Sequence, residues 1–345
     1  MRDGATDHVG GGGAAAPRRS TGERPNPLRR AGEVVFRWRE ASILLAGLML
    51  AAYFQSTNSA FLSLSNVQNL VDYTATTSII AAGEVMVLVC GELDLSAGMV
   101  YALAPFIMHF AQVAGLPAVP AVTLALAAAG IVGLINGAVT TLLDVPAFVT
   151  TLGTMFLING FTLTISGGFP VAPDAAAGFA AAFGGDVWAR LGWSLAIAVL
   201  LQFVLSRTRF GLHTIATGGN IVAASEVGIR VRSIKVRNFV LCSVLAGFAG
   251  VIDAFRIGSI DPLAGGSEIT FAAIAAAVIG GTLLTGGSGT LIGAFIGALV
   301  LGILKDGFTL DGVSAFTFDM ILGGAILLTM AVNVRLTHWR ERGGG

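Results

Sequence analysis

The chain has 345 residues, of which 54% are apolar and 12% are charged, and its mean hydropathy is +0.82. A soluble domain carries about 25% charged residues, so this composition predicts that most of the chain lies in a lipid bilayer. The net charge is zero, which gives no basic footprint for nucleic acid, and the 2 Cys and 4 His lack the spacing of metal or cofactor ligands. We therefore expect a membrane protein with no metal, no cofactor and no nucleic-acid partner.

The two ends of the chain differ in composition from the rest. Residues 1–32 are rich in Gly, Ala, Pro and Arg and lack an apolar core, which predicts a disordered cytoplasmic tail. Residues 33–338 contain the apolar runs and predict one transmembrane domain. Residues 339–345 are expected to form a second, short cytoplasmic tail.

Apolar runs of the length that crosses a bilayer, about 20 residues, recur along the whole domain. Two long uncharged stretches are each divided by turn residues, at Gly115 to Pro120 and at Thr285 to Gly289. The sequence therefore predicts an all-α bundle of about ten spans, at 41–61, 66–90, 97–114, 118–142, 146–166, 192–206, 238–255, 269–285, 289–305 and 317–334.

Basic residues predict the orientation of these spans, because Lys and Arg concentrate in cytoplasmic segments. Eight Arg precede the first span, six Lys or Arg lie in 207–237 and three follow the last span, which together make 17 of the 20 basic residues. Both termini and the loop 207–237 are therefore expected in the cytoplasm. Only Arg190, Arg256 and Lys305 depart from this pattern.

The predicted topology has one large outer loop, about 167–191, and one large inner loop, 207–237. The inner loop contains an Ala-rich stretch from Asn220 to Gly228 that can form a short helix at the membrane surface. This stretch is the natural docking point for a cytoplasmic partner.

Four segments carry a resemblance to a known family. They are Gly91-Glu92-Leu93-Asp94-Leu95-Ser96-Ala97-Gly98, Val145-Pro146 through Met155, Gly218-Gly219-Asn220 through Gly228-Ile229, and Ala275 through Thr282 followed by Gly286-Gly287-Ser288-Gly289. In this order, the set resembles the permeases of bacterial sugar ABC importers, which include the ribose, xylose and autoinducer-2 systems. The resemblance covers residues 40 to 335.

The resemblance implies roles for particular positions. The segment that family members place against their ATPase corresponds to Gly219, Asn220, Ala223, Ala224, Ser225, Glu226 and Gly228. The family-motif positions, with an implied role in gating, are Asp94, Ser96, Gly98, Pro146, Thr151 and Gly153. Glu92, where the family usually has Gly, and Ile221-Val222, where it often has Pro and an acidic residue, depart from the pattern.

The resemblance also implies the setting of the protein. It would be a permease subunit in the bacterial inner membrane that carries a small pentose-like or hexose-like sugar by alternating access. Its partners would be cytoplasmic ABC ATPase subunits, a periplasmic sugar-binding protein and a second permease chain, identical or related. The chain has no G-x-x-x-x-G-K-[S/T] phosphate-binding loop, so it is not expected to hydrolyse ATP itself.

Several of these residues also have a simpler structural interpretation. Asp94 and Ser96 precede a span, where a short polar side chain can act as an N-cap by accepting from free backbone N–H groups. The pairs Gly133/Gly137 and Gly293/Gly297 have the spacing that permits close helix packing. Asp253 and Arg256 are three residues apart, which predicts an ion pair on one helix face.

Three residues are candidates for the translocation path: Glu84, Phe148 and Asn159. An ionised carboxylate is costly inside a membrane, so Glu84 in the second span either lines the path and binds a polyol or is protonated and satisfied by a neighbouring helix. For Phe148 and Asn159, a packing role is the simpler alternative.

Two other functions fit parts of the sequence. A secondary transporter or channel for a small polar solute would also lack an ATPase site, although Glu84 is its only central acidic candidate for ion coupling. An intramembrane protease is suggested by Gly286-Gly287-Ser288-Gly289. A serine nucleophile needs a neighbouring base, and the predicted topology puts His109 near the opposite face and His338 in a tail.

Overall fold

The computed structural model describes residues 39–314 and residues 317, 320, 323, 324 and 327. In this part of the chain the regular structure is helical, and the only β contact is an isolated antiparallel bridge between Val171 and Ile260. The helices are α2 Arg39–Thr57, α3 Leu64–Val89, α4 Ala97–Val113, α5 Ala118–Leu142, α6 Ala147–Ser166, α7 Ala177–Ala180, the π-helix η1 Ala181–Gly185, α8 Val187–Arg207, α9 Arg209–Gly219, α10 Ile221–Glu226, α11 Val231–Ile257, α12 Gly266–Ile279 and α13 Leu291–Leu310.

Nine of the ten apolar runs contain a helix at the expected place, namely α2 to α6, α8 and α11 to α13. The tails 1–32 and 339–345 and most of the run 317–334 lie outside the described residues. Two boundaries differ most from expectation. Helix α11 begins at Val231, within the basic loop, and α12 ends at Ile279 because Gly281 adopts a left-handed conformation with φ of 93°.

Not every helix is long enough to cross a bilayer by itself. Among the described residues, five helices are long and apolar enough to do so: α5, α6, α8, α11 and α13. Helix α12 has 14 residues and spans about 21 Å at 1.5 Å per residue. It leads into an irregular segment before α13, and such backbone is tolerated at membrane depth only where protein surrounds it.

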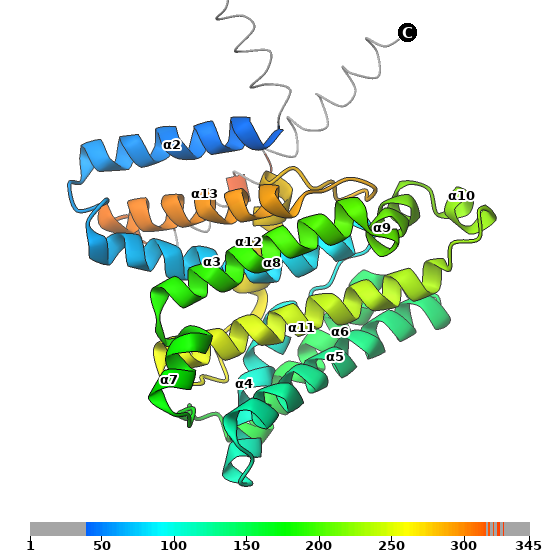
Figure 1. Cartoon of the computed structure of the whole chain (residues 1–345), viewed down its shortest axis with the longest axis horizontal. Helices are drawn as coiled ribbons and strands as arrows, with labels where there is room; N and C mark the ends of the chain where they lie inside the picture. Colours follow the sequence, from blue (N-terminus) through cyan, green and yellow to red (C-terminus); the bar gives the residue numbers. More distant parts are fainter. Residues whose placement is uncertain (1–38, 315–316, 318–319, 321–322, 325–326, 328–345) are drawn as a thin grey trace, which may run out of the picture.

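Helices α3 and α11 form the centre of the bundle. Helix α11 packs against α3, α4 and α5, while α2 packs on the outside against α13 (Figure 1). The close approach of α5 to α11 depends on glycine, because a Cβ on Gly133 would lie 2.4 Å from Phe239 O and one on Gly137 would lie 2.7 Å from Val236 Cα. The predicted packing role of this glycine pair is confirmed, and Gly293 and Gly297 meet α12 in the same way.

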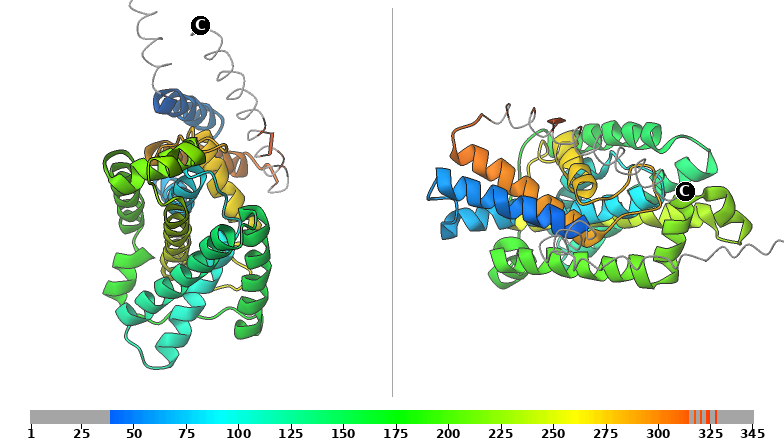
Figure 2. Two further views of the ribbon diagram at one scale, coloured as in Figure 1. Left: turned by 90° about the vertical axis from the view of Figure 1, so that its right-hand side faces the viewer. Right: turned by 90° about the horizontal axis from the view of Figure 1, so that it is seen from above.

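The bundle has two ends that matter for function. The end that carries α9 and α10 lies at the right of Figure 1, and we call it the α10 end. The end that carries α7 and the first turn of α8 lies at the left, and we call it the α7 end. Figure 2 shows the bundle from its α10 end and from above, with α9 and α10 at its periphery.

Candidate functional site

A buried network of polar side chains joins the first two motifs. Asp94 Oδ1 accepts from the backbone N–H of Ser96 at 2.9 Å and from its hydroxyl at 2.6 Å. Asn136 Nδ2 donates to Ser96 Oγ at 2.8 Å, and Thr154 Oγ1 donates to Asn136 Oδ1 at 2.7 Å. Helices α4, α5 and α6 are therefore linked through polar side chains, of which Asp94, Ser96 and Asn136 are fully buried.

The network corrects one expectation about helix capping. Ser96 occupies the N-cap position of α4, yet its side chain makes no capping hydrogen bond. Its hydroxyl is committed instead to Asp94 and Asn136. Asp94 does accept from a free backbone N–H, as predicted, but it braces the irregular segment before α4 rather than the first turn of the helix.

The other motif positions lie around this network. Gly98 N donates to Thr270 Oγ1 at 2.9 Å, and a Cβ on Gly98 would lie 2.1 Å from Gly266 O, so α4 and α12 touch here through glycine. Thr151 is buried and its hydroxyl donates to Ala147 O at 2.9 Å. Pro146 is the residue immediately before α6. The last of these positions, Gly153, has open space where a Cβ would be.

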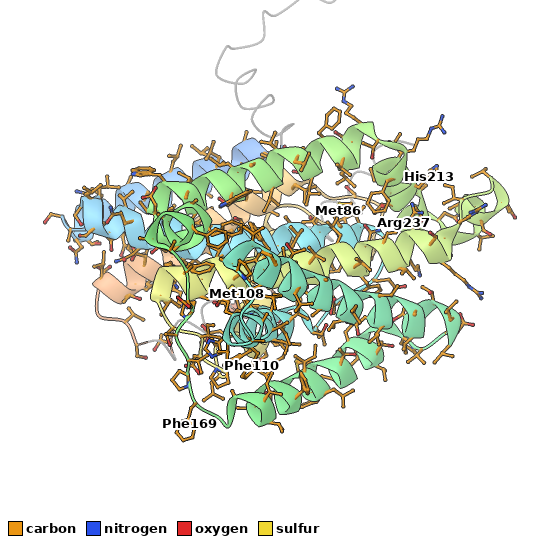
Figure 3. The ribbon with its side chains drawn as sticks, turned by 60° about the horizontal axis from the view of Figure 1, so that its bottom comes forward. Met86, Met108, Phe110, Phe169, His213 and Arg237 are labelled. Atoms are coloured by element: carbon orange, nitrogen blue, oxygen red, sulfur yellow. The ribbon has the colours of Figure 1, made fainter. Side chains whose placement is uncertain are left out.

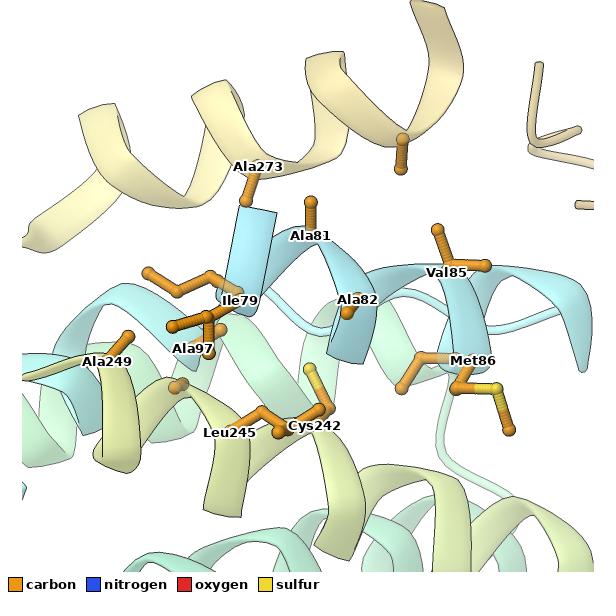
Figure 4. Packing of buried hydrophobic residues seen from close by; sticks show 14 of the residues in the cluster. Ile79, Ala81, Ala82, Val85, Met86, Ala97, Cys242, Leu245, Ala249 and Ala273 are labelled. Carbon is orange, nitrogen blue, oxygen red and sulfur yellow. The ribbon is translucent and has the colours of Figure 1, made fainter. Parts of the chain in front are cut away.

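Glu84 lies deep in the core between α3 and α11. It is fully buried, and its Oε1 lies 3.7 Å from the Cys242 Sγ that donates to it. Figure 4 shows Cys242 of α11 directed toward α3, beside Ala82. Within the described part of the chain, Oε2 of Glu84 has no hydrogen-bond partner.

The three path candidates do not form one site in this conformation. Phe148 is exposed in the first turn of α6 and lines a small cavity with Gly91 and Leu284. Asn159 is partly buried on the same helix, about 16 Å further along at 1.5 Å per residue. Their role in translocation stays a prediction.

At the α10 end, three motif segments meet through glycines. Gly287 N donates to Val89 O at 2.9 Å, which joins the segment after α12 to the end of α3. A Cβ on Gly218 would lie 1.9 Å from the same Val89 O. Gly219 also meets this segment, since a Cβ on Gly287 would lie 2.8 Å from its Cα. We call this contact of Val89, Gly218, Gly219, Gly286 and Gly287 the glycine junction.

The expected short helix in the inner loop is present as α10, beside the glycine junction. Its N-cap is Asn220, whose side chain accepts from the backbone N–H groups of Val222 and Ala223 at 3.1 and 3.0 Å. Ala224 is buried against its own chain. The outward-facing side chains of the helix are those of Ile221, Val222, Ala223, Ser225 and Glu226.

Basic residues surround α10. Arg230, Arg232 and Lys235 line a cavity with Ile221 and Ser225. Lys235 forms an ion pair with Glu92 of the first motif. Figure 3 shows His213 and Arg237 at this same end of the bundle, away from Phe169.

The α7 end carries all three cations that depart from the basic-residue pattern, and each is ion-paired. Arg190 pairs with Asp72, Arg256 Nε lies 2.5 Å from Asp253 Oδ1, and Lys305 Nζ lies 3.2 Å from Glu268 Oε1. The predicted pair of Asp253 and Arg256 is confirmed. Tyr101 Oη also donates to Asp253 at 2.6 Å.

These ion pairs surround a cavity of about 390 Å³ between α3, α11, α12 and α13. Its lining includes Asp72, Thr76, Asp253, Arg256 and Glu268. No pattern in the sequence predicted a site here. Two sequence features could have indicated this cavity. Asp72 is an acidic residue within a predicted span, like Glu84, and the three cations depart from the basic-residue pattern.

The all-helical fold and its five long apolar helices, among the described residues, are those of a polytopic helical membrane protein. Comparison with known sequences identifies its family. Residues 66–330 match the family model described as the permease component of the branched-chain amino acid transport system. The chain therefore belongs to this permease family.

Relatives of known role extend the comparison. The chain is 37% identical to the xylose/arabinose import permease XylH of Sulfolobus acidocaldarius, over 87% of this chain and 86% of that protein. It is 35% identical to the ribose import permease RbsC of Escherichia coli, over 84% and 91%. It is also 33% identical to the autoinducer 2 import permease LsrC of Photorhabdus luminescens, over 86% and 90%. No solved structure matches the chain significantly.

Proposed function

We propose that this chain is the membrane-spanning subunit of an ABC importer and forms the path for a small, neutral, pentose-like or hexose-like sugar. The observation that carries the proposal is its similarity, along most of both chains, to permeases named for the import of xylose, arabinose and ribose. The chain lacks a phosphate-binding loop, so a separate ATPase polypeptide would supply the energy.

The orientation follows from the charges at the two ends of the bundle. The α10 end carries the six basic residues of segment 207–237, so it faces the cytoplasm, and the α7 end faces outward. Both chain termini are then cytoplasmic, and about ten helices cross the inner membrane.

The partners follow from this orientation. Helix α10 would insert into a groove of the cytoplasmic ATPase, with Ile221, Val222 and Ala223 at the contact and Glu226 at its rim. Motion of α10 would reach the core through the glycine junction, because backbone packed directly on backbone leaves no side chain to absorb a displacement. A sugar-binding protein would deliver its cargo at the α7 end, and a second permease chain would complete the path.

Uptake by the reconstituted complex tests the proposal. The permease is co-expressed with its ATPase and binding-protein partners, and uptake of radiolabelled D-xylose and D-ribose into proteoliposomes is measured with internal and external ATP. We expect uptake that requires both the binding protein and ATP on the α10 side. An ATPase variant with its phosphate-loop Lys changed to Ala serves as the control. Uptake that follows an ion gradient and ignores ATP would instead identify a secondary transporter.

A further inference from the structure

The cavity at the α7 end has the size and lining of a small-molecule site. Its volume of about 390 Å³ lies within the range of 300–1,000 Å³ that is typical of ligand pockets. It is bounded by helices far apart in the sequence, namely α3, α11, α12 and α13.

The charges around the cavity balance one another. Asp72, Asp253 and Glu268 are matched by Arg190, Arg256 and Lys305 in the ion pairs described above. A site with paired charges has no net attraction for an ion, whereas its carboxylates and guanidinium can still accept from and donate to hydroxyl groups. A neutral polyol, which both donates and accepts, is the ligand that suits this lining.

One side chain of the cavity lacks a partner in the resting structure. Thr76 is 5% exposed and lines the cavity, and within the described residues its Oγ1 makes no hydrogen bond. An unpartnered buried hydroxyl costs stability, and among the described residues Thr76 is the one with such a hydroxyl that also lines this cavity, where a ligand can supply the partner. A purely structural role in holding the helices together would explain the ion pairs, but it would not involve the Thr76 hydroxyl.

We propose that this cavity is the first site in the permease to receive the sugar, and that Thr76 Oγ1 forms a hydrogen bond with one of its hydroxyl groups. The Arg256 guanidinium lines the same cavity and would donate to the same ligand. Its Nε lies 2.5 Å from Asp253 Oδ1, and its Nη1 lies 3.8 Å from Asp72 Oδ2. Tyr73 provides an aromatic wall, and Lys305 Nζ lies 5.0 Å from the centre of its ring. The inference rests on the proposed function, which places this end outside the cell.

The chain offers a matched control on the same helix. Thr74 of α3 is also buried, at 2% exposure, and its Oγ1 also has no partner among the described residues, but it does not line the cavity. Instead it faces α13, where it lies 3.0 Å from the position of a Cβ on Gly302. Thr74→Val and Thr76→Val therefore remove the same group from similar depth, and only the second removes it from the proposed site.

The test is uptake of D-xylose and D-ribose by the complete importer. Loss of one net hydrogen bond predicts a decrease of about two- to tenfold in kcat/KM of uptake for Thr76→Val. Thr76→Ser, which keeps the hydroxyl, and Thr74→Val are expected to transport like wild type. Thermal stability in detergent should not fall in Thr76→Val, because the lost hydroxyl had no partner.

A second measurement reports occupancy directly. Asn69 lines the cavity and the preceding Gln68 does not, although both are exposed. D-xylose should slow the reaction of an impermeant thiol reagent with Asn69→Cys and leave Gln68→Cys unchanged. Equal uptake by Thr76→Val and Thr74→Val in an importer that transports either pentose would overturn the sugar site alone. A wild-type complex that takes up no pentose and no hexose would overturn the proposed function and the site with it.

Discussion

Asn136 donates to the hydroxyl of Ser96 at 2.8 Å and thereby ties α5 to the irregular segment that precedes α4. The contact is fully buried, with both residues at 0% exposure. Because Asn136 also accepts from Thr154, a single amide holds three consecutive helices in register.

Replacing this amide should destabilise the bundle. Asn136→Ala removes one hydrogen bond from Ser96 and one from Thr154, so we expect a loss of about 1–2 kcal/mol in stability. The measurement is thermal unfolding of the purified permease in detergent. Thr162→Val is the control, since Thr162 is as deeply buried but its hydroxyl has no partner within the described residues. If the two variants unfold at the same temperature, the network does not contribute to stability.

The glycine junction makes a sharper prediction about two adjacent residues. Gly218→Ala places a methyl group 1.9 Å from Val89 O, which should cost about 1–3 kcal/mol and separate α9 from α3. Gly219→Ala meets nothing closer than 3.9 Å and should be mild. Membrane abundance and sugar uptake of the two variants are compared. Equal uptake at equal abundance would mean that the junction does not couple α9 to the core.

Glu84 should tolerate Gln better than Leu. Glutamine retains an oxygen that can accept a hydrogen bond from the Cys242 thiol, whereas leucine leaves this buried thiol without its acceptor. Sugar uptake is therefore expected to fall more for Glu84→Leu than for Glu84→Gln, at equal membrane abundance. Wild-type uptake by both variants would assign Glu84 to packing.

The exposed side of α10 should govern binding of the ATPase. Val222 is 63% exposed, so Val222→Asp adds a charge to the proposed contact without disturbing the permease itself. We expect loss of ATPase co-purification and of uptake, while Glu226→Gln has a mild effect because a single rim charge contributes about 1 kcal/mol or less.

The buried side of α10 provides the contrast to Val222. Ala224→Trp should displace the whole helix, because Ala224 is only 3% exposed and packs against its own chain. Its effect on coupling is therefore indirect and should be accompanied by a lower unfolding temperature. ATPase binding that survives Val222→Asp would place the contact elsewhere.

The orientation is tested by thiol labelling in intact cells. In a background with Cys90 and Cys242 changed to Ala, an impermeant reagent should label Ala177→Cys and spare Ser225→Cys. Both positions are exposed, so access to the reagent depends on the side of the membrane and not on burial in the protein. The reverse pattern would contradict the assignment of the α10 end to the cytoplasm.

Sequence alone was sufficient for the class of fold, for nine helix positions and for the short helix α10. Hydropathy and the Asn220 cap are local signals, because each depends on residues close together in the chain. The i,i+3 pair of Asp253 and Arg256 was predictable for the same reason.

Tertiary structure alone decided which polar groups of different helices meet. Asp72 and Arg190 are 118 residues apart, and Asn136 and Ser96 are 40 apart, so no periodicity in the sequence links them. Which side of a short helix is buried was equally undetermined, since Ala223 and Ala224 are the same residue type and only packing of α10 on its own chain distinguishes them. The cavity at the α7 end exists because four helices from distant parts of the chain converge there, and convergence is a property of packing rather than of any local pattern.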